Sequence, residues 1–409
     1  MVGIAAMTMA YVLSQFFRSF MAVLTPALMA DLGASKAQLS AASGWWFATF
    51  ALMQFVVGIS LDRFGPRRTL AVIMGLGCGL GCFVFAGATA PWMIALAMAL
   101  IGAGCAPVLM AAMFVFARLY PPARLAMLTS LVIGVGSLGN VGGTAPLAAA
   151  AGIWGWRAML FAIGVAAIVT ALAVLAVVRD PPRIETGGGG GIWAGYLQVL
   201  RLRRLWPIFP MVGLNYAPMI GILGLWAGPY LADVHGADAL AIGRVTFFMA
   251  LAALAGSFLY GPLDAIFGTR KWVAFAGNLG SVLVLSWLAL FPTQGTVAIT
   301  VALCLIAVFG SSYALLMAHG RAFVPTHLTG RGITLLNFFS IAWVGVMQML
   351  SGHVVDAWTD PARPEAAYVA LFTFYAASVG LALAVYLLSK DAPPERDVIR
   401  PAAGRAPTR

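Results

Sequence analysis

The sequence predicts an all-α membrane protein with about twelve transmembrane helices in two pseudo-symmetric six-helix bundles. The 409 residues are 62% hydrophobic and only 9% charged, with a mean hydropathy of +0.95, whereas soluble domains carry about a quarter charged residues. At roughly 20 residues for each span plus short loops, a chain of this length holds about twelve helices. One short basic motif also occurs twice, once in each half of the chain.

The repeated motif lies between two long apolar runs in each half. The first copy is Gly58-Ile-Ser-Leu-Asp62-Arg63-Phe-Gly65-Pro-Arg67-Arg68, and the second is Gly261-Pro-Leu-Asp264-Ala-Ile-Phe-Gly268-Thr-Arg270-Lys271. Asp31 and Asp233 precede the two loop aspartates by the same number of residues, so the repeat extends beyond the motif. Two parallel halves of this kind are typical of transporters, with a substrate held near the midplane between them.

The expected spans follow from the apolar runs, interrupted by turn residues and charges. In order they cover residues 3–32, 41–61, 69–88, 92–118, 125–151, 158–178, 207–232, 241–259, 272–291, 296–324, 333–355 and 368–388. We therefore predict an N-terminal bundle over 1–178, a cytoplasmic linker over 179–205, a C-terminal bundle over 206–389 and a cytoplasmic tail over 390–409. Within the linker, the glycines at 187–191 indicate flexible coil, and residues 192–205 are expected to lie on the inner membrane surface.

Lysine and arginine collect on one side of this topology. The other side holds only Lys36, Arg157, Arg244 and Arg363. By the positive-inside rule the arginine-rich side is cytoplasmic, so we expect both termini inside and the chain in the inner membrane. Topology explains the net charge of +11, and no nucleic-acid partner is expected. The expected partners are membrane lipid and a small-molecule substrate, with the protein acting as a monomer.

The pattern Gly-x-x-x-Asp-Arg-x-Gly-x-Arg-Arg resembles the loop between helices 2 and 3 of the major facilitator superfamily. The resemblance implies two bundles that rock about a central site, so that the site opens alternately to either side. It also implies that the loop aspartate caps a helix N-terminus of the opposite half and closes the cytoplasmic side. On this basis the predicted gating residues are Gly58, Asp62, Arg63, Gly65, Arg67, Arg68, Asp264, Gly268 and Arg270.

Arg18 is the only basic residue deep in a predicted span. It lies roughly 20 Å before Asp31, which ends that span, and hence near the bilayer midplane. A charge there costs at least about 2.5–3.5 kcal/mol on insertion scales. A structural ion pair is one interpretation, but all 13 acidic residues fall in loops, tails or helix ends. We therefore expect the guanidinium to bind a carboxylate or phosphate through two parallel hydrogen bonds.

Arg18 is also similar to an arginine in organophosphate and organic-anion branches of the superfamily. That arginine contacts the substrate anion, and a proline follows two turns later, as Pro26 does here. The phosphate exchangers pair it with a second arginine in helix 7, and the corresponding residue here is Ile220. A monocarboxylate or similar anion is therefore expected in preference to a dianionic phosphate. Nitrate carriers need an arginine in helix 2, which this chain lacks.

Further polar and aromatic residues of the predicted spans are candidates for the same site. Tyr11 and Gln15 share a helix face with Arg18. Interface anchoring is the alternative for the aromatic residues, and hydrogen bonding between helices is the alternative for the amides. With Arg18, the predicted substrate-binding residues are Tyr11, Gln15, Trp46, Asn140, Asn215, Tyr216, Trp226, Tyr313, Asn337 and Gln348.

The resulting prediction is a secondary active transporter for a small, carboxylate-type organic anion. A multidrug or metabolite exporter is the first alternative; drug exporters typically have an arginine in helix 4, near which Met98 stands here. A non-transporting sensor on the same fold is the second, although such proteins usually carry an added domain. No nucleophile–base pair, metal cluster or nucleotide loop is visible, so neither an enzyme nor a cofactor is expected. A structural role is expected for His319, with proton relay as its alternative, and symport, antiport and uniport stay open.

Overall fold

A computed structural model describes residues 2–120, 122–181, 192–325 and 328–393, and every regular element within these ranges is a helix. Ten helices in this part of the chain are long and apolar enough to cross a membrane, or up to eleven if the bent pair α1 (Val2–Phe16) and α2 (Phe20–Leu32) is one span. The prediction of an all-helical membrane protein is confirmed. The predicted count of about twelve spans is not reached by this criterion.

The elements follow one another in two successive groups. The first group continues with α3 (Lys36–Phe64), α4 (Pro66–Met74), the π-helical turn η1 (Gly75–Gly79), α5 (Leu80–Ala86), α6 (Pro91–Cys105), α7 (Pro107–Leu119), α8 (Pro122–Gly136), α9 (Leu138–Gly142) and α10 (Ala145–Val177). Next come α11 (Ile192–Leu200) and the 3₁₀ turn η2 (Arg203–Leu205). The second group contains α12 (Phe209–Leu214), α13 (Tyr216–Gly221), the π-helical turn η3 (Ile222–Trp226), α14 (Ala227–His235), α15 (Ala239–Phe267), α16 (Lys271–Leu290), α17 (Thr296–Gly310), α18 (Tyr313–Arg321), α19 (Thr329–Ala357) and α20 (Glu365–Tyr386).

The two groups use the same signals to turn the chain after their first span. Gly33 and Gly236 end α2 and α14 with φ of 61° and 62°, a left-handed conformation that glycine adopts at little cost. The next helix then starts at a side-chain cap. Ser35 forms a capping box with Gln38 before α3, and Asp238 accepts from the Ala241 amide before α15.

The first span is bent by 49° between α1 and α2, whereas the sequence predicted one continuous helix over 3–32. At the bend, the amides of Arg18 and Ser19 bond to carbonyls three residues back, at 3.1 and 3.2 Å, which tightens the turn. Ser19 Oγ also donates to the carbonyl of Asn140, at 2.8 Å. This hydrogen bond to α9 lies next to Arg18 and stabilises the bend there.

Helix α10 contains one residue outside the helical conformation, Gly155, with φ 77° and ψ 154°. The neighbouring residues bond to the end of α2. Trp156 Nε1 donates to Asp31 Oδ2 at 2.8 Å, and Arg157 Nη1 pairs with the same oxygen at 3.0 Å. The break therefore falls between the spans predicted over 125–151 and 158–178.

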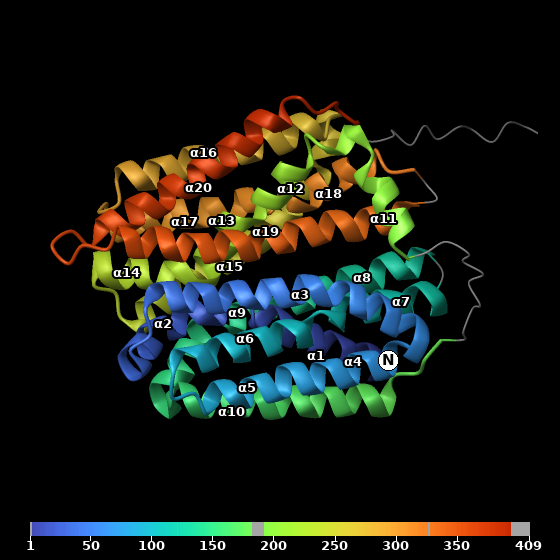
Figure 1. The fold of residues 1–409 in the computed structure, drawn as a ribbon, viewed down its shortest axis with the longest axis horizontal. Coiled ribbons are helices and arrows are strands. Elements are labelled where there is room, and N and C mark those ends of the chain that lie inside the picture. Colours follow the sequence, from blue (N-terminus) through green and yellow to red (C-terminus); the bar gives the residue numbers. More distant parts are fainter. Residues whose placement is uncertain (1, 121, 182–191, 326–327, 394–409) are drawn as a thin grey trace, which may run out of the picture.

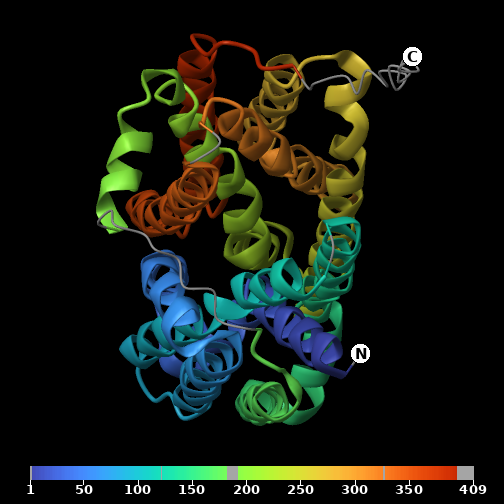
Figure 2. The same cartoon turned by 90° about the vertical axis from the view of Figure 1, so that its right-hand side faces the viewer.

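Viewed along the helices, the group up to α10 (blue to green) and the group from α12 onward (green-yellow to red) lie on opposite sides of the molecule (Figure 2). We call them the N half and the C half. They meet where α3 lies beside α19 and α2 beside α14 (Figure 1). Glycines allow this close approach: a Cβ on Gly228 of α14 would lie 1.9 Å from the Ala22 carbonyl oxygen of α2.

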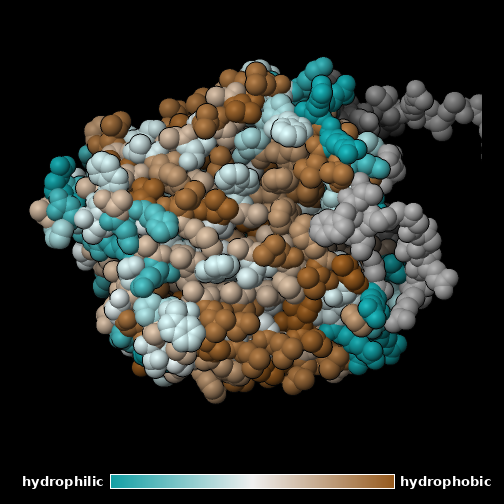
Figure 3. Space-filling view, viewed as in Figure 1, coloured by the Kyte–Doolittle hydropathy of each residue, from teal (hydrophilic) through white to brown (hydrophobic). Residues whose placement is uncertain are grey.

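The surface is consistent with a membrane location. On the face shown in Figure 3, hydrophobic residues cover the middle and hydrophilic residues collect at the two ends. One end carries the N-terminus and the starts of α4 and α16, and we call it the arginine-rich end (Figure 1). The other carries the start of α3 and is called the Lys36 end.

Near the arginine-rich end, Val199 of α11 and Leu205 are buried together with Leu335 of α19, so segment 192–205 packs onto the C half.

Candidate functional site

A cavity of about 370 Å³ lies between the two halves. This volume is near the lower end of the range for small-molecule pockets, about 300–1,000 Å³. Seven of the eleven predicted binding residues line it: Tyr11, Gln15, Arg18, Asn140, Tyr216, Tyr313 and Asn337. Several of them lie at or next to interruptions in helices, such as the α1–α2 bend and the α12–α13 break at Asn215. Discontinuous helices at the midplane are the usual framework of transporter binding sites.

Arg18 projects into this cavity from the bend between α1 and α2. Its guanidinium carbon lies 5.5 Å from the ring centroid of Trp46 and 5.4 Å from that of Phe50, both on α3, within the range of a cation–π contact. Arg18 Nε is buried without a hydrogen-bond partner. In the described part of the chain, no carboxylate lies within 4.0 Å of the guanidinium. Among the described residues, the charge therefore lies against aromatic rings and next to the Tyr216 side chain, with no carboxylate partner.

Phenol and amide groups surround the arginine. The rings of Tyr216 and Tyr313 stack at 5.0 Å with an interplanar angle of 30°. Tyr313 donates its hydroxyl proton to Asn337 Oδ1 at 2.7 Å, and Gln15 Oε1 is buried without a partner. Both halves thus contribute polar groups to the same space, as in transporter folds whose substrate site lies between two halves.

The structure places the other four predicted binding residues behind the cavity wall. Trp46 lies under Arg18 with its own Nε1 unpartnered. Trp226 Nε1 donates to Ser351 Oγ at 2.9 Å. Asn215 Nδ2 donates to Asn278 Oδ1 at 2.6 Å and to Ser312 Oγ at 2.9 Å. The side-chain amide of Gln348 is buried without hydrogen-bond partners. Its Oε1 packs against Gly221 of α13, where an added Cβ would lie 2.8 Å away. For Trp226 and Asn215, hydrogen bonding between helices accounts for the polar side chain.

Other lining residues were not singled out from the sequence. Phe50 and Gln54 line the cavity and follow Trp46 at intervals of four residues, so the shared helix face was a signal that could have found them. The wall formed by α15 consists of Ala250, Ala253, Leu254 and Ser257. In an apolar span these residue types carry no mark that separates a cavity face from a lipid face.

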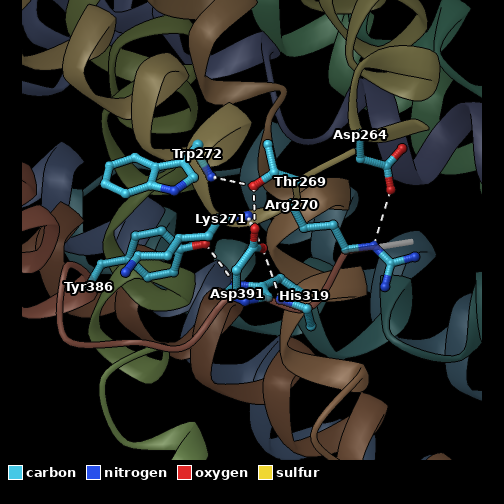
Figure 4. Close-up of polar contacts among 9 residues, drawn as sticks. Asp264, Thr269, Arg270, Lys271, Trp272, His319, Tyr386 and Asp391 are labelled. Carbon is cyan, nitrogen blue, oxygen red and sulfur yellow. Dashed lines mark hydrogen bonds and ion pairs between the residues drawn. The ribbon is translucent and has the colours of Figure 1, made fainter. Parts of the chain in front are cut away.

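At the arginine-rich end, each half fastens the loop that carries the repeated motif in the same way. The Arg67 amide at the start of α4 donates to Asp180 Oδ1 at 2.9 Å. In the C half the Lys271 amide at the start of α16 donates to Asp391 Oδ1 at 3.0 Å, and Thr269 Oγ1 donates to its other oxygen (Figure 4). A carboxylate at a helix N-terminus satisfies free amides and interacts favourably with the helix dipole.

Asp180 and Asp391 were both missed as functional residues. Each follows the last helix of its half, in Asp180-Pro-Pro and Asp391-Ala-Pro-Pro, and this repeated pattern was the available signal. The resemblance implied that a loop aspartate caps a helix of the opposite half. In the structure the caps on α4 and α16 come from the same half, and Asp264 instead pairs with Arg270, at 3.1 Å (Figure 4).

The remaining predicted gating residues have varied surroundings. Gly65 and Gly268 adopt φ of 82° and 66° at the ends of α3 and α15, so both turns favour glycine. Gly58 lies in α3 with open space around it, Arg63 lies over the ring of Phe64, and Arg68 is exposed. The side chain of Asp62 lies outside the described residues.

His319 is buried beside the Asp391 cap (Figure 4). Its Nε2 lies 2.9 Å from the carbonyl oxygen of Lys390, and its Nδ1 lies 2.7 Å from the hydroxyl of Tyr386. A carbonyl can only accept, so Nε2 carries a proton and donates to the Lys390 carbonyl, and Nδ1 shares a hydrogen bond with the Tyr386 hydroxyl. These contacts tie the chain after α20 to α18.

The Lys36 end is closed by contacts between the two halves. Lys36 Nζ pairs with Asp233 Oδ2 of α14, and Tyr368 of α20 donates to the same oxygen. The Ala37 amide donates to Asp356 Oδ1 of α19 at 3.3 Å. The cavity-lining residues of α1, α8 and α15 lie level with Arg18 or nearer the arginine-rich end. The cavity is therefore separated from the Lys36 end by joined helices.

A cavity between two groups of membrane helices, surrounded by helix breaks, is an arrangement found in transporter folds. Residues 7–340 match the family model described as Major Facilitator Superfamily, so the chain belongs to this superfamily. The resemblance seen in the repeated loop is thus confirmed at the level of the superfamily. A comparison with curated protein sequences found no match.

Solved structures share the fold over nearly the whole chain. A bacterial homologue of the human lysosomal transporter Spinster, in an inward-facing and occupied conformation, has a TM-score of 0.76 at 21% identity, covering 94% of this chain and 96% of that one. The nucleoside transporter NupG has a TM-score of 0.76 at 13% identity, with coverages of 94% and 98%. A D-xylose–proton symporter has a TM-score of 0.70 at 14% identity, with coverages of 94% and 97%. At these identities the likeness shows the fold alone.

Proposed function

We propose that the protein is a secondary active transporter that moves a small, carboxylate-type organic anion across the inner membrane by alternating access. The observation that carries the proposal is Arg18, whose guanidinium faces the central cavity with no carboxylate within 4.0 Å among the described residues. A buried charge needs a partner, and a planar guanidinium suits a carboxylate that can accept two hydrogen bonds.

The proposal includes twelve membrane spans in two six-helix bundles. In the N half these are α1–α2, α3, α4–α5, α6–α7, α8–α9 with α10 as far as Gly155, and the rest of α10. In the C half they are α12–α14, α15, α16, α17–α18, α19 and α20. The arginine-rich end is placed in the cytoplasm by the positive-inside rule. The proposed functional unit is the monomer, and residues of one chain line both sides of the cavity.

Alternating access is supported by the unequal closure of the two ends. The halves are joined at the Lys36 end, and the cavity extends from Arg18 toward the arginine-rich end. Rocking of the halves would open the cavity at the Lys36 end and close it at the arginine-rich end. Asp264 with Arg270, and the loops containing Gly65 and Gly268, are then the parts that close the arginine-rich end. A multidrug exporter and a non-transporting sensor are the alternatives on this fold.

Ligand-dependent thermal stability of the purified full chain tests this function. The panel contains small carboxylates, phosphonates, nitrate, sugars and cationic dyes. A ligand that binds only the folded protein stabilises it by about 2.7 kcal/mol at 100 times its Kd. We expect a carboxylate to raise the melting temperature of the wild type and of Arg244→Met, which removes an exposed arginine, but not of Arg18→Met.

Arg18→Lys is the matched variant for the binding geometry. It keeps the positive charge but loses the planar fork, so the carboxylate should bind it more weakly than the wild type and more tightly than Arg18→Met. Uptake of the stabilising compound into proteoliposomes then separates transport from sensing. Stabilisation by neutral or cationic compounds alone, equal in wild type and Arg18→Met, would contradict the organic-anion function and favour the exporter.

A further inference from the structure

We propose that the cavity selects monocarboxylates with a compact apolar body, whose carboxylate lies at Arg18 and whose body lies against α15. This proposal rests on the proposed function, because it names the class of anion that the same site takes. It is carried by the uneven distribution of unsatisfied polar groups around the cavity, and it assigns Ala253 of α15 as a specificity-determining residue.

Among the described residues, the buried polar side-chain atoms of the cavity lining that lack a hydrogen-bond partner are Arg18 Nε and Gln15 Oε1. Tyr11 and Tyr216 line the cavity with them, and the guanidinium is held over two rings of α3. A buried polar atom without a partner is unfavourable, so this side of the cavity is suited to the charged, hydrogen-bonding end of a ligand.

Three of the four serines that line the cavity donate their hydroxyl protons to helix carbonyls. Ser257 Oγ and Ser311 Oγ both donate to the Ala253 carbonyl, at 3.0 and 2.9 Å. Ser137 Oγ, between α8 and α9, donates to the Ile133 carbonyl at 2.9 Å. Beside these hydroxyls the wall of α15 is Ala250, Ala253 and Leu254. A ligand group placed here finds an apolar surface and no free donor from these serines.

The geometry separates the two surfaces across the cavity. The guanidinium of Arg18 extends over two rings of α3 (blue), and α3 and α15 (yellow) lie on opposite sides of the central region in Figure 2. A ligand with its charge at Arg18 therefore directs the rest of its body toward α15. A polyhydroxylated body would lose its hydrogen bonds to water there without replacement, whereas an apolar body would not. The two alanines leave the room that such a body fills.

Dissociation constants of the full-length protein for four probes test this inference. The probes are cyclohexanecarboxylate, acetate, gluconate and cyclohexanecarboxamide, which vary the body and the charge separately. We expect cyclohexanecarboxylate to bind at least about tenfold more tightly than gluconate. Ala253→Phe should raise the dissociation constant of cyclohexanecarboxylate by about tenfold or more, while that of acetate should change by less than about twofold. Ala255→Phe, the same change at an exposed position of α15, should leave both unchanged.

Leu254→Asn is the second variant, because it changes the polarity of the wall while keeping the number of side-chain heavy atoms and the branch at Cγ. It should narrow the ratio between gluconate and cyclohexanecarboxylate. Gluconate binding as tightly as cyclohexanecarboxylate to the wild type would overturn the proposal, as would equal weakening of acetate and cyclohexanecarboxylate by Ala253→Phe. Carboxamide binding as tight as carboxylate binding, insensitive to Arg18→Met, would overturn the anion function itself and with it this proposal.

Discussion

Lys36 of α3 and Asp233 of α14 form an ion pair that joins the two halves, with 2.5 Å between Nζ and Oδ2. Their side chains are 14% and 31% exposed, and Tyr368 donates to the same carboxylate oxygen. The cavity lies between this contact and the arginine-rich end of the molecule. If the halves rock as proposed, this pair must break whenever the site opens at the Lys36 end.

We expect Asp233→Asn to favour opening at the Lys36 end. The change removes the charge but keeps an acceptor for Tyr368. Partly exposed ion pairs contribute up to about 1 kcal/mol to stability. The population that is open at the Lys36 end should therefore rise by up to about fivefold. Spin labels at the exposed positions Thr89 and Gln294, one in each half, would report a larger fraction of long distances. Arg363→Gln is the control, because its pair with Glu365 lies within the C half. An unchanged distance distribution would contradict the prediction that the Lys36–Asp233 pair keeps the Lys36 end closed.

Gly228→Ala should weaken the same closure through packing alone. A Cβ on Gly228 would lie 1.9 Å from the Ala22 carbonyl oxygen, and backbone must move to relieve such a contact. Overpacking of this kind costs typically about 1–3 kcal/mol, so we expect a lower melting temperature and longer distances between the same labels. Gly261→Ala, where no atom lies within 4 Å of the added Cβ, should be neutral or stabilising. Wild-type behaviour of Gly228→Ala would argue against this close contact.

Asp180→Ala and Asp391→Ala should each loosen the helix that the aspartate caps. Loss of an N-cap costs about 0.5–2 kcal/mol, and hydrogen exchange should quicken in the first turn of α4 for Asp180→Ala and of α16 for Asp391→Ala. Asp360→Ala is a suitable control, because Asp360 accepts from the Ala362 amide in an exposed loop. The prediction fails if exchange quickens equally at both helix starts in either variant, or at neither.

The Asp391 cap should persist down to acid pH. Burial opposes ionisation of Asp391, but hydrogen bonds from Thr269 and from the amides of Lys271 and Ala392 outweigh it, so its pKa lies below the usual range. A depressed carboxyl pKa contributes stability that is present above the unfolded pKa of about 3.9 and is lost as pH falls through the folded value. The stability difference between wild type and Asp391→Asn should therefore be constant from about pH 8 to 5 and shrink below about pH 4.

A difference that closes at about pH 6–7 would contradict this expectation, because carboxyl groups with lowered pKa values do not titrate there. Such a result would indicate that a histidine controls the segment. His319 contacts the Lys390 carbonyl and is the residue to substitute next. His319→Gln retains an amide donor for that carbonyl and removes the titration.

Arg18 was found from sequence because a lone charge in an apolar span is conspicuous wherever its helix faces. Asn215 and Trp226 gave a similar signal, yet their side chains bond to Asn278 and Ser351 within the C half. Whether a polar side chain meets the cavity or a neighbouring helix depends on the rotation of each helix about its axis. That rotation is set by packing, which the residue types of a single span do not reveal.

The sequence by itself determined that this is an all-helical membrane protein with an internal repeat and one arginine at mid-span. Those properties follow from local composition, because the cost of placing polar and charged groups in lipid acts on each segment separately. Only the tertiary structure decided that the first span bends at Arg18, that Asp180 and Asp391 cap the motif loops, and that Lys36 meets Asp233. Each of these contacts joins segments distant in the chain, and their approach depends on how all the helices pack together.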